Sequence, residues 1–176
     1  MKRIILLSVI TISSFCYGQK LVLKPTGFEP VVFQVDSIKA PTIYKRAMDW
    51  IQLTYKNPKE VLKASIENES IRLEGFTGNA FVRTFKSGNK SNYGLYYTLE
   101  IYIKDGRYRF VFTPNQIVTD DNTKIFRFGI PDFFDGKVDI NGNSYEGCAS
   151  TLESSTNELA LSLYNYILGK KENNNW

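Results

Sequence analysis

The sequence predicts an α+β domain in which an antiparallel sheet carries two helices packed on one face. Three observations lead to this class. Runs that alternate between apolar and polar residues dominate the middle of the chain. Two other stretches repeat their apolar residues at helical spacing. Asp105-Gly106 joins two alternating runs as a tight hairpin, which makes those strands antiparallel. The resulting order is strand, helix, four strands and helix.

The first predicted elements are a strand and a helix. Residues 20–24 alternate enough for a short strand, which Pro25-Thr26-Gly27 interrupts. Residues 31–35 form a stronger strand, with the odd-numbered side chains on one face. The first helix is expected over residues 42–55, because its apolar residues recur at helical spacing. That apolar stripe comprises Tyr44, Ala47, Met48, Trp50, Ile51 and Tyr55.

Four strands are predicted to follow this helix. Gly75 and Gly78 fall inside the second of them and predict a bulge or a bend there. The polar residues 86–92 predict an exposed loop between the second and the third. The four strands are expected over residues 61–67, 71–85, 93–104 and 107–113.

The Asp105-Gly106 turn determines the register of the last two of these strands. A two-residue turn of this kind needs positive φ at both positions, which Asp and Gly tolerate. One face of the pair is then apolar, with Ile103 opposite Tyr108, Ile101 opposite Phe110, and Leu99 opposite Phe112. We expect helices to cover the apolar face and to leave the other face at least partly open. That other face is mixed, with Lys104 opposite Arg107, Tyr102 opposite Arg109, and Glu100 opposite Val111.

Beyond residue 113 the alternation weakens. Residues 124–128 predict a short strand, and residues 131–147 are dense in Gly, Asp and Asn and predict mostly loop. Residues 170–176 contain three consecutive asparagines and are expected to form a disordered tail. The folded domain is therefore predicted to span residues 19–169.

A second helix is expected in the carboxy-terminal part of the domain. Ser155 and Glu158 fit a capping box at its start, although the helix could begin nearer Thr151. Gly169 is a suitable stop, because glycine favours the left-handed conformation that follows many helices. The core stripe of this helix consists of Ala160, Leu163, Tyr164 and Ile167.

The first 18 residues predict a signal peptide. Lys2 and Arg3 precede an apolar run over residues 4–15, and Cys16-Tyr17-Gly18 places small residues before a cleavage site at Gln19. We therefore expect an exported chain, periplasmic or secreted. No later apolar stretch reaches membrane length, so no transmembrane segment is expected after cleavage. A retained anchor or a buried amino-terminal strand is the alternative.

A lipid anchor on Cys16 is a further alternative for the amino terminus. Cleavage immediately before this cysteine would make it the first residue and available for acylation. The bulky Phe15 stands where a small residue should precede such a cysteine, and it argues against this pathway.

Composition limits the mature chain to a single domain of balanced charge. Removal of 18 residues from 176 leaves 158, which suits one domain with a sizeable core. Loss of Lys2 and Arg3 lowers the net charge from +4 to +2, which does not predict nucleic-acid binding. Cys148 would be the one remaining cysteine, so no intramolecular disulfide is expected, and we expect its thiol to be buried.

Four stretches carry a family resemblance: residues 43–51, 61–66, 71–75 and 96–112. They resemble an uncharacterised family of exported bacterial proteins, the domain of unknown function 4468 family. The resemblance covers roughly residues 30–113 and implies a TATA-binding-protein-like fold. No activity is established for the family, so the resemblance assigns no functional residue, and its fold name implies no DNA binding.

The absence of histidine excludes several catalytic classes. Ser-His-Asp and Cys-His mechanisms require it, and its absence also removes the usual zinc and iron sites. Residues 139–143 resemble the start of a calcium loop, but Ser144 replaces the required glycine and Ser150 replaces the bidentate glutamate. The sequence therefore predicts no metal and no cofactor.

Carboxylates provide the alternative, enzymatic hypothesis. A hydrolase or a lyase could use a pair of acids held at a defined separation. Acids in a loop rich in Gly and Asn are usually solvated, which is the plainer interpretation. The candidates are Asp132, Asp135, Asp139 and Glu146.

The mixed face of the hairpin provides the leading hypothesis, a non-enzymatic binding module. Aromatic and guanidinium groups together suit stacking and anion recognition and are common at interfaces. The expected partner is an envelope protein, a peptide or an anionic polymer. The alternative is an ordinary solvated sheet face, in which such pairs stabilise the strands. The predicted site residues are Tyr96, Tyr102, Lys104, Arg107 and Arg109.

Overall fold

The computed structural model describes residues 20–119, 129–134, 136–139 and 141–170. The predicted signal peptide, Cys16, the strand over residues 124–128, Asp135 and the tail beyond residue 170 lie outside this part. The elements are β1 (Leu23–Lys24), β2 (Gly27–Phe28), β3 (Val31–Gln34), α1 (Ala40–Thr54), α2 (Pro58–Val61), β4 (Leu62–Ile66), β5 (Ser70–Thr84), β6 (Lys90–Lys104), β7 (Arg107–Thr119), the 3₁₀ helix η1 (Ile130–Phe133) and α3 (Cys148–Ile167).

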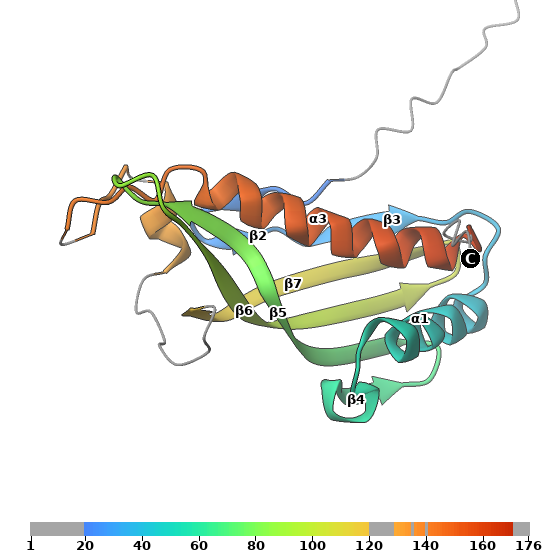
Figure 1. The fold of residues 1–176 in the computed structure, drawn as a ribbon. Coiled ribbons are helices and arrows are strands. Elements are labelled where there is room, and N and C mark those ends of the chain that lie inside the picture. The colour runs from blue at the N-terminus through green and yellow to red at the C-terminus, as the bar shows by residue number, and fades with distance from the viewer. Residues whose placement is uncertain (1–19, 120–128, 135, 140, 171–176) are drawn as a thin grey trace, which may run out of the picture.

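The centre of the fold is a five-stranded antiparallel sheet with the strand order β3-β7-β6-β5-β4. Figure 1 shows α3 running along this sheet, with α1 near the carboxy-terminal end of α3. β1 and β2 pair separately as a small hairpin. The α+β class with an antiparallel sheet and two packed helices is confirmed. Among the described residues, no helix is long and apolar enough to cross a bilayer.

The core lies between the helices and one face of the sheet. Strand alternation buries Leu95, Tyr97, Leu99, Ile101 and Ile103 of β6 on this face. α1 meets them with a buried stripe close to the predicted one, and α3 adds the predicted Ala160, Leu163 and Ile167. The buried residues of α1 are Ile43, Ala47, Trp50 and Ile51.

The hairpin between β6 and β7 has the predicted register in all six pairs. Gly106 takes a positive φ of 72°, but the expectation of a positive φ at Asp105 is wrong, because only Ser37 and Asn68 show one among the described non-glycine residues. The Asp105 carboxylate instead accepts hydrogen bonds from the Ala40 amide at 2.8 Å and the Lys39 ammonium at 3.1 Å. The turn thus caps the amino terminus of α1, whose own first residues supply no side-chain cap.

Two strands are longer than predicted. β6 begins at Lys90, so the expected loop over residues 86–92 is shorter. β7 continues past Pro114, which pairs with Tyr97 beside a register shift between Tyr96 and Tyr97. A bulge is one of the few places where a sheet accepts proline, because the missing N–H is not needed there. The predicted irregularity in β5 is confirmed between Thr77 and Phe81.

α3 begins at Cys148, seven residues before the predicted capping box, which is therefore wrong. The Ser155 hydroxyl donates to the carbonyls of Ala80 and Thr151 instead of capping a helix. The Val82 amide of β5 lies 3.5 Å from the Thr151 hydroxyl. Bonds to the strand thus determine where this serine- and threonine-rich segment is helical, and local propensity does not reveal them.

The carboxy-terminal stop of α3 is confirmed. Gly169 has a φ of 72°, which is the left-handed conformation expected after a helix. The Lys170 amide donates to the Asn165 carbonyl at 2.9 Å, and the Gly169 amide donates to the Tyr166 carbonyl at 2.9 Å. These two bonds form a Schellman motif, which satisfies the last carbonyls of the helix.

Candidate binding site on the open sheet face

The face of the sheet opposite the helices, called here the open face, carries one row of residues from all five strands of the sheet. Cross-strand pairing places Val32 beside Arg109, Arg109 beside Tyr102, Tyr102 beside Ser70, and Ser70 beside Ile66. Val32, Tyr102 and Ile66 are 37%, 38% and 57% exposed. The row therefore presents aliphatic side chains at both ends and a tyrosine–arginine pair between them.

Four of the five predicted site residues line one groove on this face. The groove has a volume of about 630 Å³ and is called here the cationic groove. Tyr96 is not part of it, because it lies farther along β6, where its ring packs 4.7 Å from the ring of Phe76. The groove is lined by Val32, Ile66, Glu69, Ser70, Tyr102, Ile103, Lys104, Arg107, Tyr108 and Arg109.

Tyr102 and Arg109 form a stacked pair inside the groove. The Arg109 guanidinium carbon lies 4.5 Å from the centre of the Tyr102 ring, within the range of a cation–π interaction. The Tyr102 hydroxyl donates to the Glu100 carboxylate at 3.3 Å. One ring face and the hydroxyl of Tyr102 are thus already engaged, and the stacked guanidinium keeps its outer N–H donors for a ligand.

Lys104 and Arg107 are two like charges directly opposite each other across β6 and β7. Both side chains are exposed, and neither forms an ion pair within the described part of the chain. Like charges at opposed positions destabilise a sheet. Elsewhere on the open face Lys63 has an acidic partner, Glu74, at 3.7 Å. The groove thus holds uncompensated positive charge in the native fold.

Val32, Ile66 and Glu69 belong to the groove but were not predicted. Val32 comes from β3, Ile66 from β4 and Glu69 from the turn that follows β4. The hairpin register could place only residues of β6 and β7 together. The order of strands across the sheet depends on long-range pairing, which no local pattern reports.

A second hollow of about 1130 Å³ lies between α1 and α3. Three of its four charged lining residues have partners, whereas the fourth, Lys170, forms no ion pair with the described residues. Lys45 pairs with Asp49 at 3.0 Å, and the Trp50 indole N–H donates to the Ser162 hydroxyl at 3.1 Å. The Arg46 guanidinium donates to the Ile167 carbonyl at the end of α3. The Trp50 and Arg46 contacts join the two helices, and the described residues that line the hollow include no opposed pair of like charges such as Lys104 and Arg107 in the cationic groove.

The acids of the enzymatic hypothesis are separately engaged. Asp132 accepts hydrogen bonds from Lys137 at 2.8 Å and from the Gly129 amide at 2.7 Å, and these bonds lower its pKa. The side chain and amide of Asn143 likewise lower the pKa of Asp139. A general acid needs a raised pKa, so neither carboxylate is prepared for that role.

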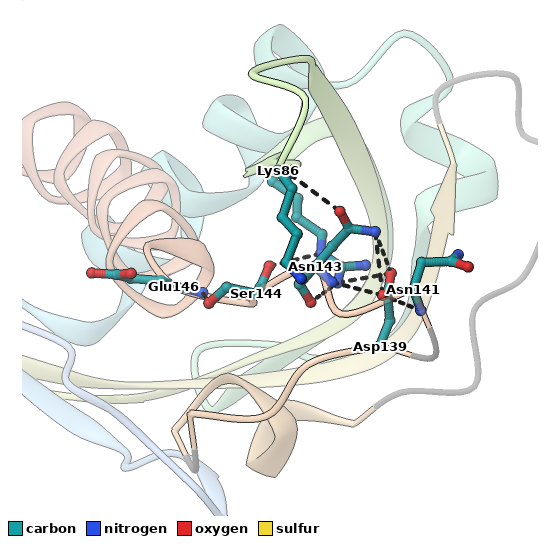
Figure 2. A network of polar contacts seen from close by, with 7 residues as sticks. Lys86, Asp139, Asn141, Asn143, Ser144 and Glu146 are labelled. Carbon is teal, nitrogen blue, oxygen red and sulfur yellow. Dashed lines mark hydrogen bonds and ion pairs between the residues drawn. The ribbon is translucent and has the colours of Figure 1, made fainter.

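Asp139 and Glu146 do not converge. Figure 2 shows the Asp139 carboxylate directed at Asn143, while the Glu146 carboxylate points away from both of them. The Glu146 amide donates to the Ser144 hydroxyl at 2.9 Å, and its own side chain is exposed. The carboxylates of Asp132 and Asp139 therefore organise turns of this loop, and Figure 2 shows that those of Asp139 and Glu146 do not face each other.

Arg83 is a buried cation that the sequence analysis missed. It is 2% exposed and donates to the carbonyls of Asn143 and Ser144 at 2.7 and 3.0 Å. It also pairs with Asp139 at 3.2 Å and stacks 3.8 Å from the centre of the Tyr145 ring. This cation fastens the loop before α3 to strand β5.

Cys148 is buried, as predicted, and it lies near this cluster. Burial raises the pKa of its thiol to about 11, and the Arg83 charge lowers it only partly. The sulfur lies 3.9 Å from the Val82 carbonyl, which accepts its weak hydrogen bond. At neutral pH this cysteine is a thiol, and a thiol is a poor nucleophile.

Comparison with protein families assigns residues 30–116 to a domain of unknown function with a TBP-like fold, DUF4468. The match covers 87 of the 176 residues, so this segment is similar to the DUF4468 family. The matched segment runs from the residue before β3 into β7, so it includes helix α1, four strands of the central sheet and most of the fifth, β7. No curated protein matches the chain.

Two solved structures share the fold. A TBP-like protein from Parabacteroides distasonis ATCC 8503 is 13% identical with a TM-score of 0.56, and the alignment covers 81% of this chain and 93% of that one. A DUF4468 family protein from Bacteroides ovatus ATCC 8483 is also 13% identical, with a TM-score of 0.51 and coverage of 81% and 84%. At this identity the likeness shows a common fold and no more.

Proposed function

We propose that this protein is an exported, non-enzymatic binding module that holds its partner on the open face. The observation that carries the proposal is the opposed pair Lys104 and Arg107, which lacks acidic partners among the described residues. Like charges at opposed positions destabilise a sheet, and departures from local rules gather at functional sites. Export rests on the amino-terminal signal pattern.

The neighbours of this pair support a contact surface. Arg109 and Tyr102 are residue types that often contribute strongly at interfaces, and both are exposed beside the pair. Val32 and Ile66 add exposed aliphatic area at the ends of the same groove. An anionic partner would supply the missing charge and cover the apolar ends.

The test is capture of partners by the tagged full chain from an envelope extract. We expect the double variant Tyr102→Ala, Arg109→Ala to lose a protein or polymer that the wild type retains. The matched control is Lys56→Ala, Lys59→Ala, which removes exposed side chains that do not line the groove. Circular dichroism and thermal melts establish that each variant is folded. Unchanged recovery by the folded groove variant would contradict the proposal.

Export has its own test. Expression in a bacterium with a periplasm, followed by intact-mass measurement of the processed chain, distinguishes the possibilities. We expect cleavage before Gln19. A mass that contains an acyl group on Cys16 would identify a lipid anchor, and retention of residues 1–18 would contradict signal cleavage.

A further inference from the structure

We infer that the occupant of the cationic groove is an extended peptide segment with acidic residues at its centre and aliphatic residues on either side. This inference rests on the proposed function and adds the chemistry of the partner. Three properties of the groove support it: its charge, the apolar ends of its central row, and the state of its single exposed tyrosine.

Charge complementarity requires acidic groups in the partner. The groove is lined by Lys104, Arg107 and Arg109 against one acid, Glu69. Carboxylates that bridge Lys104 and Arg107 would remove their mutual repulsion and form charge-assisted hydrogen bonds. The partner therefore relieves a repulsion that the free protein contains.

The apolar ends of the row favour a peptide. Val32 and Ile66 lie on the two edge strands of the sheet, at opposite ends of the row that contains Arg109 and Tyr102. Strands about 4.8 Å apart place these ends about 19 Å from each other. An extended peptide of about six residues covers that distance. Its end residues would bury both aliphatic side chains while its centre lies over the cations.

The tyrosine disfavours an anionic polysaccharide. Sugar rings are held largely by packing on open aromatic faces, and one face of Tyr102 is already occupied by the Arg109 guanidinium. Sugars also offer little apolar area to cover Val32 and Ile66. The acidic peptide satisfies both the charge and the apolar ends, whereas the polysaccharide satisfies only the charge.

A displayed library of random octapeptides, selected on the full chain, tests this class of ligand. We expect enrichment of Asp and Glu at central positions with Ile, Leu, Val or Phe two or three residues away on each side. Counter-selection on Lys104→Ala, Arg107→Ala should remove these sequences. Enrichment of neutral or basic peptides, or enrichment that survives counter-selection, would overturn the inference.

Fluorescence anisotropy with the best enriched peptide measures each contribution. We expect Lys104→Ala, Arg107→Ala to weaken binding at least about tenfold, and to reduce its salt dependence. Replacement of the peptide's Asp and Glu by Asn and Gln should have a comparable effect. Ile66→Ser should weaken binding about threefold to tenfold through lost apolar burial. The control Lys56→Ala, Lys59→Ala should bind as the wild type does.

Polygalacturonate oligomers form the competing arm of the same experiment. Displacement of the peptide by a tighter-binding oligomer would reassign the groove to anionic saccharides and overturn the peptide inference.

The experiments distinguish failure of the peptide inference from failure of the proposed binding function. If no acidic peptide is enriched while capture from the envelope extract still requires Tyr102 and Arg109, the binding function stands and the ligand class is wrong. If neither experiment depends on the groove residues, the binding function itself is wrong.

Discussion

Arg83 and Arg107 belong to the same sheet but differ in their burial and in the partners of their guanidinium groups. Arg83 is buried, has two carbonyl acceptors, pairs with a carboxylate and stacks on an aromatic ring. Arg107 is exposed and stands opposite another cation. The fold itself thus satisfies the charge of Arg83. The charge of Arg107 is left available for a binding partner.

This contrast separates a structural cation from a functional one. Removing a buried, fully bonded charge leaves acceptors without donors, so stability should fall. Removing one of two opposed surface cations relieves repulsion, so stability should hold or rise while binding falls. The following predictions test the contrast in order of decreasing effect.

Arg83→Ala should give the largest effect, a loss of about 3 kcal/mol in the free energy of unfolding. The substitution leaves the carbonyls of Asn143 and Ser144 without their donor and removes the partner of Asp139. Urea denaturation measures the change. The control is Arg72→Ala, an exposed arginine on the same strand, which should change stability by no more than about 0.5 kcal/mol. Equal effects at the two positions would remove the distinction.

Asp139→Asn should destabilise the protein less, and in a pH-dependent manner. Hydrogen bonds from Asn143 depress the pKa of Asp139, so its contribution is present above its unfolded pKa of about 3.9 and is lost as the pH falls through the lower folded pKa. The stability difference between wild type and variant should shrink as the pH falls below about 4. Urea midpoints from pH 7 to pH 2 measure this difference. Asp105, Asp132 and Glu153 titrate in both proteins, so their contributions cancel in the difference. A difference that does not change with pH would contradict this assignment.

Tyr102→Ala should cost about 0.5–1 kcal/mol of stability. It removes the stacking with Arg109 and the hydrogen bond to Glu100 on an exposed face. Thermal denaturation detects the change. The same variant should bind the acidic peptide measurably more weakly, so a stability loss with unchanged binding would show that the pair only supports the sheet.

Arg107→Glu should give the smallest effect on stability and one of opposite sign, a gain of about 0.2–1 kcal/mol. Glutamate would replace the repulsion of Lys104 by an attraction across the same strand pair. Denaturant midpoints and peptide anisotropy are measured together. Higher stability with lost binding would confirm that the native arginine serves recognition. Lower stability would show that Arg107 is structural like Arg83.

Much of the fold could be predicted from local patterns. The Asp105-Gly106 turn and the alternation around it gave the correct register, and the helical stripe of α1 was correct to within two residues at its start. These features depend on residues close in sequence. The capping box at Ser155 was the wrong start for α3, because that hydroxyl donates to the Ala80 carbonyl of β5. The alternative start near Thr151 is three residues from the observed one at Cys148.

The candidate site was predicted only in part, because some of its residues are close in sequence and others meet only through long-range pairing. Tyr102, Lys104, Arg107 and Arg109 share one hairpin, so one turn brings them together. Val32 and Ile66 join them only through the order of the whole sheet. One available signal was overlooked at Arg83. It shares strand parity with the buried Phe81, which places it on the inner face, where a cation needs partners.

The contacts between α3 and β5 also cover part of an edge of the sheet. β4 pairs only with the beginning of β5, so the rest of that edge would offer free amides and carbonyls, a template for strand addition and aggregation. Cys148, Thr151 and Ser155 occupy this edge through Val82 and Ala80. Because the helix covers these backbone groups, it should oppose intermolecular β-pairing in a chain rich in tyrosine and phenylalanine.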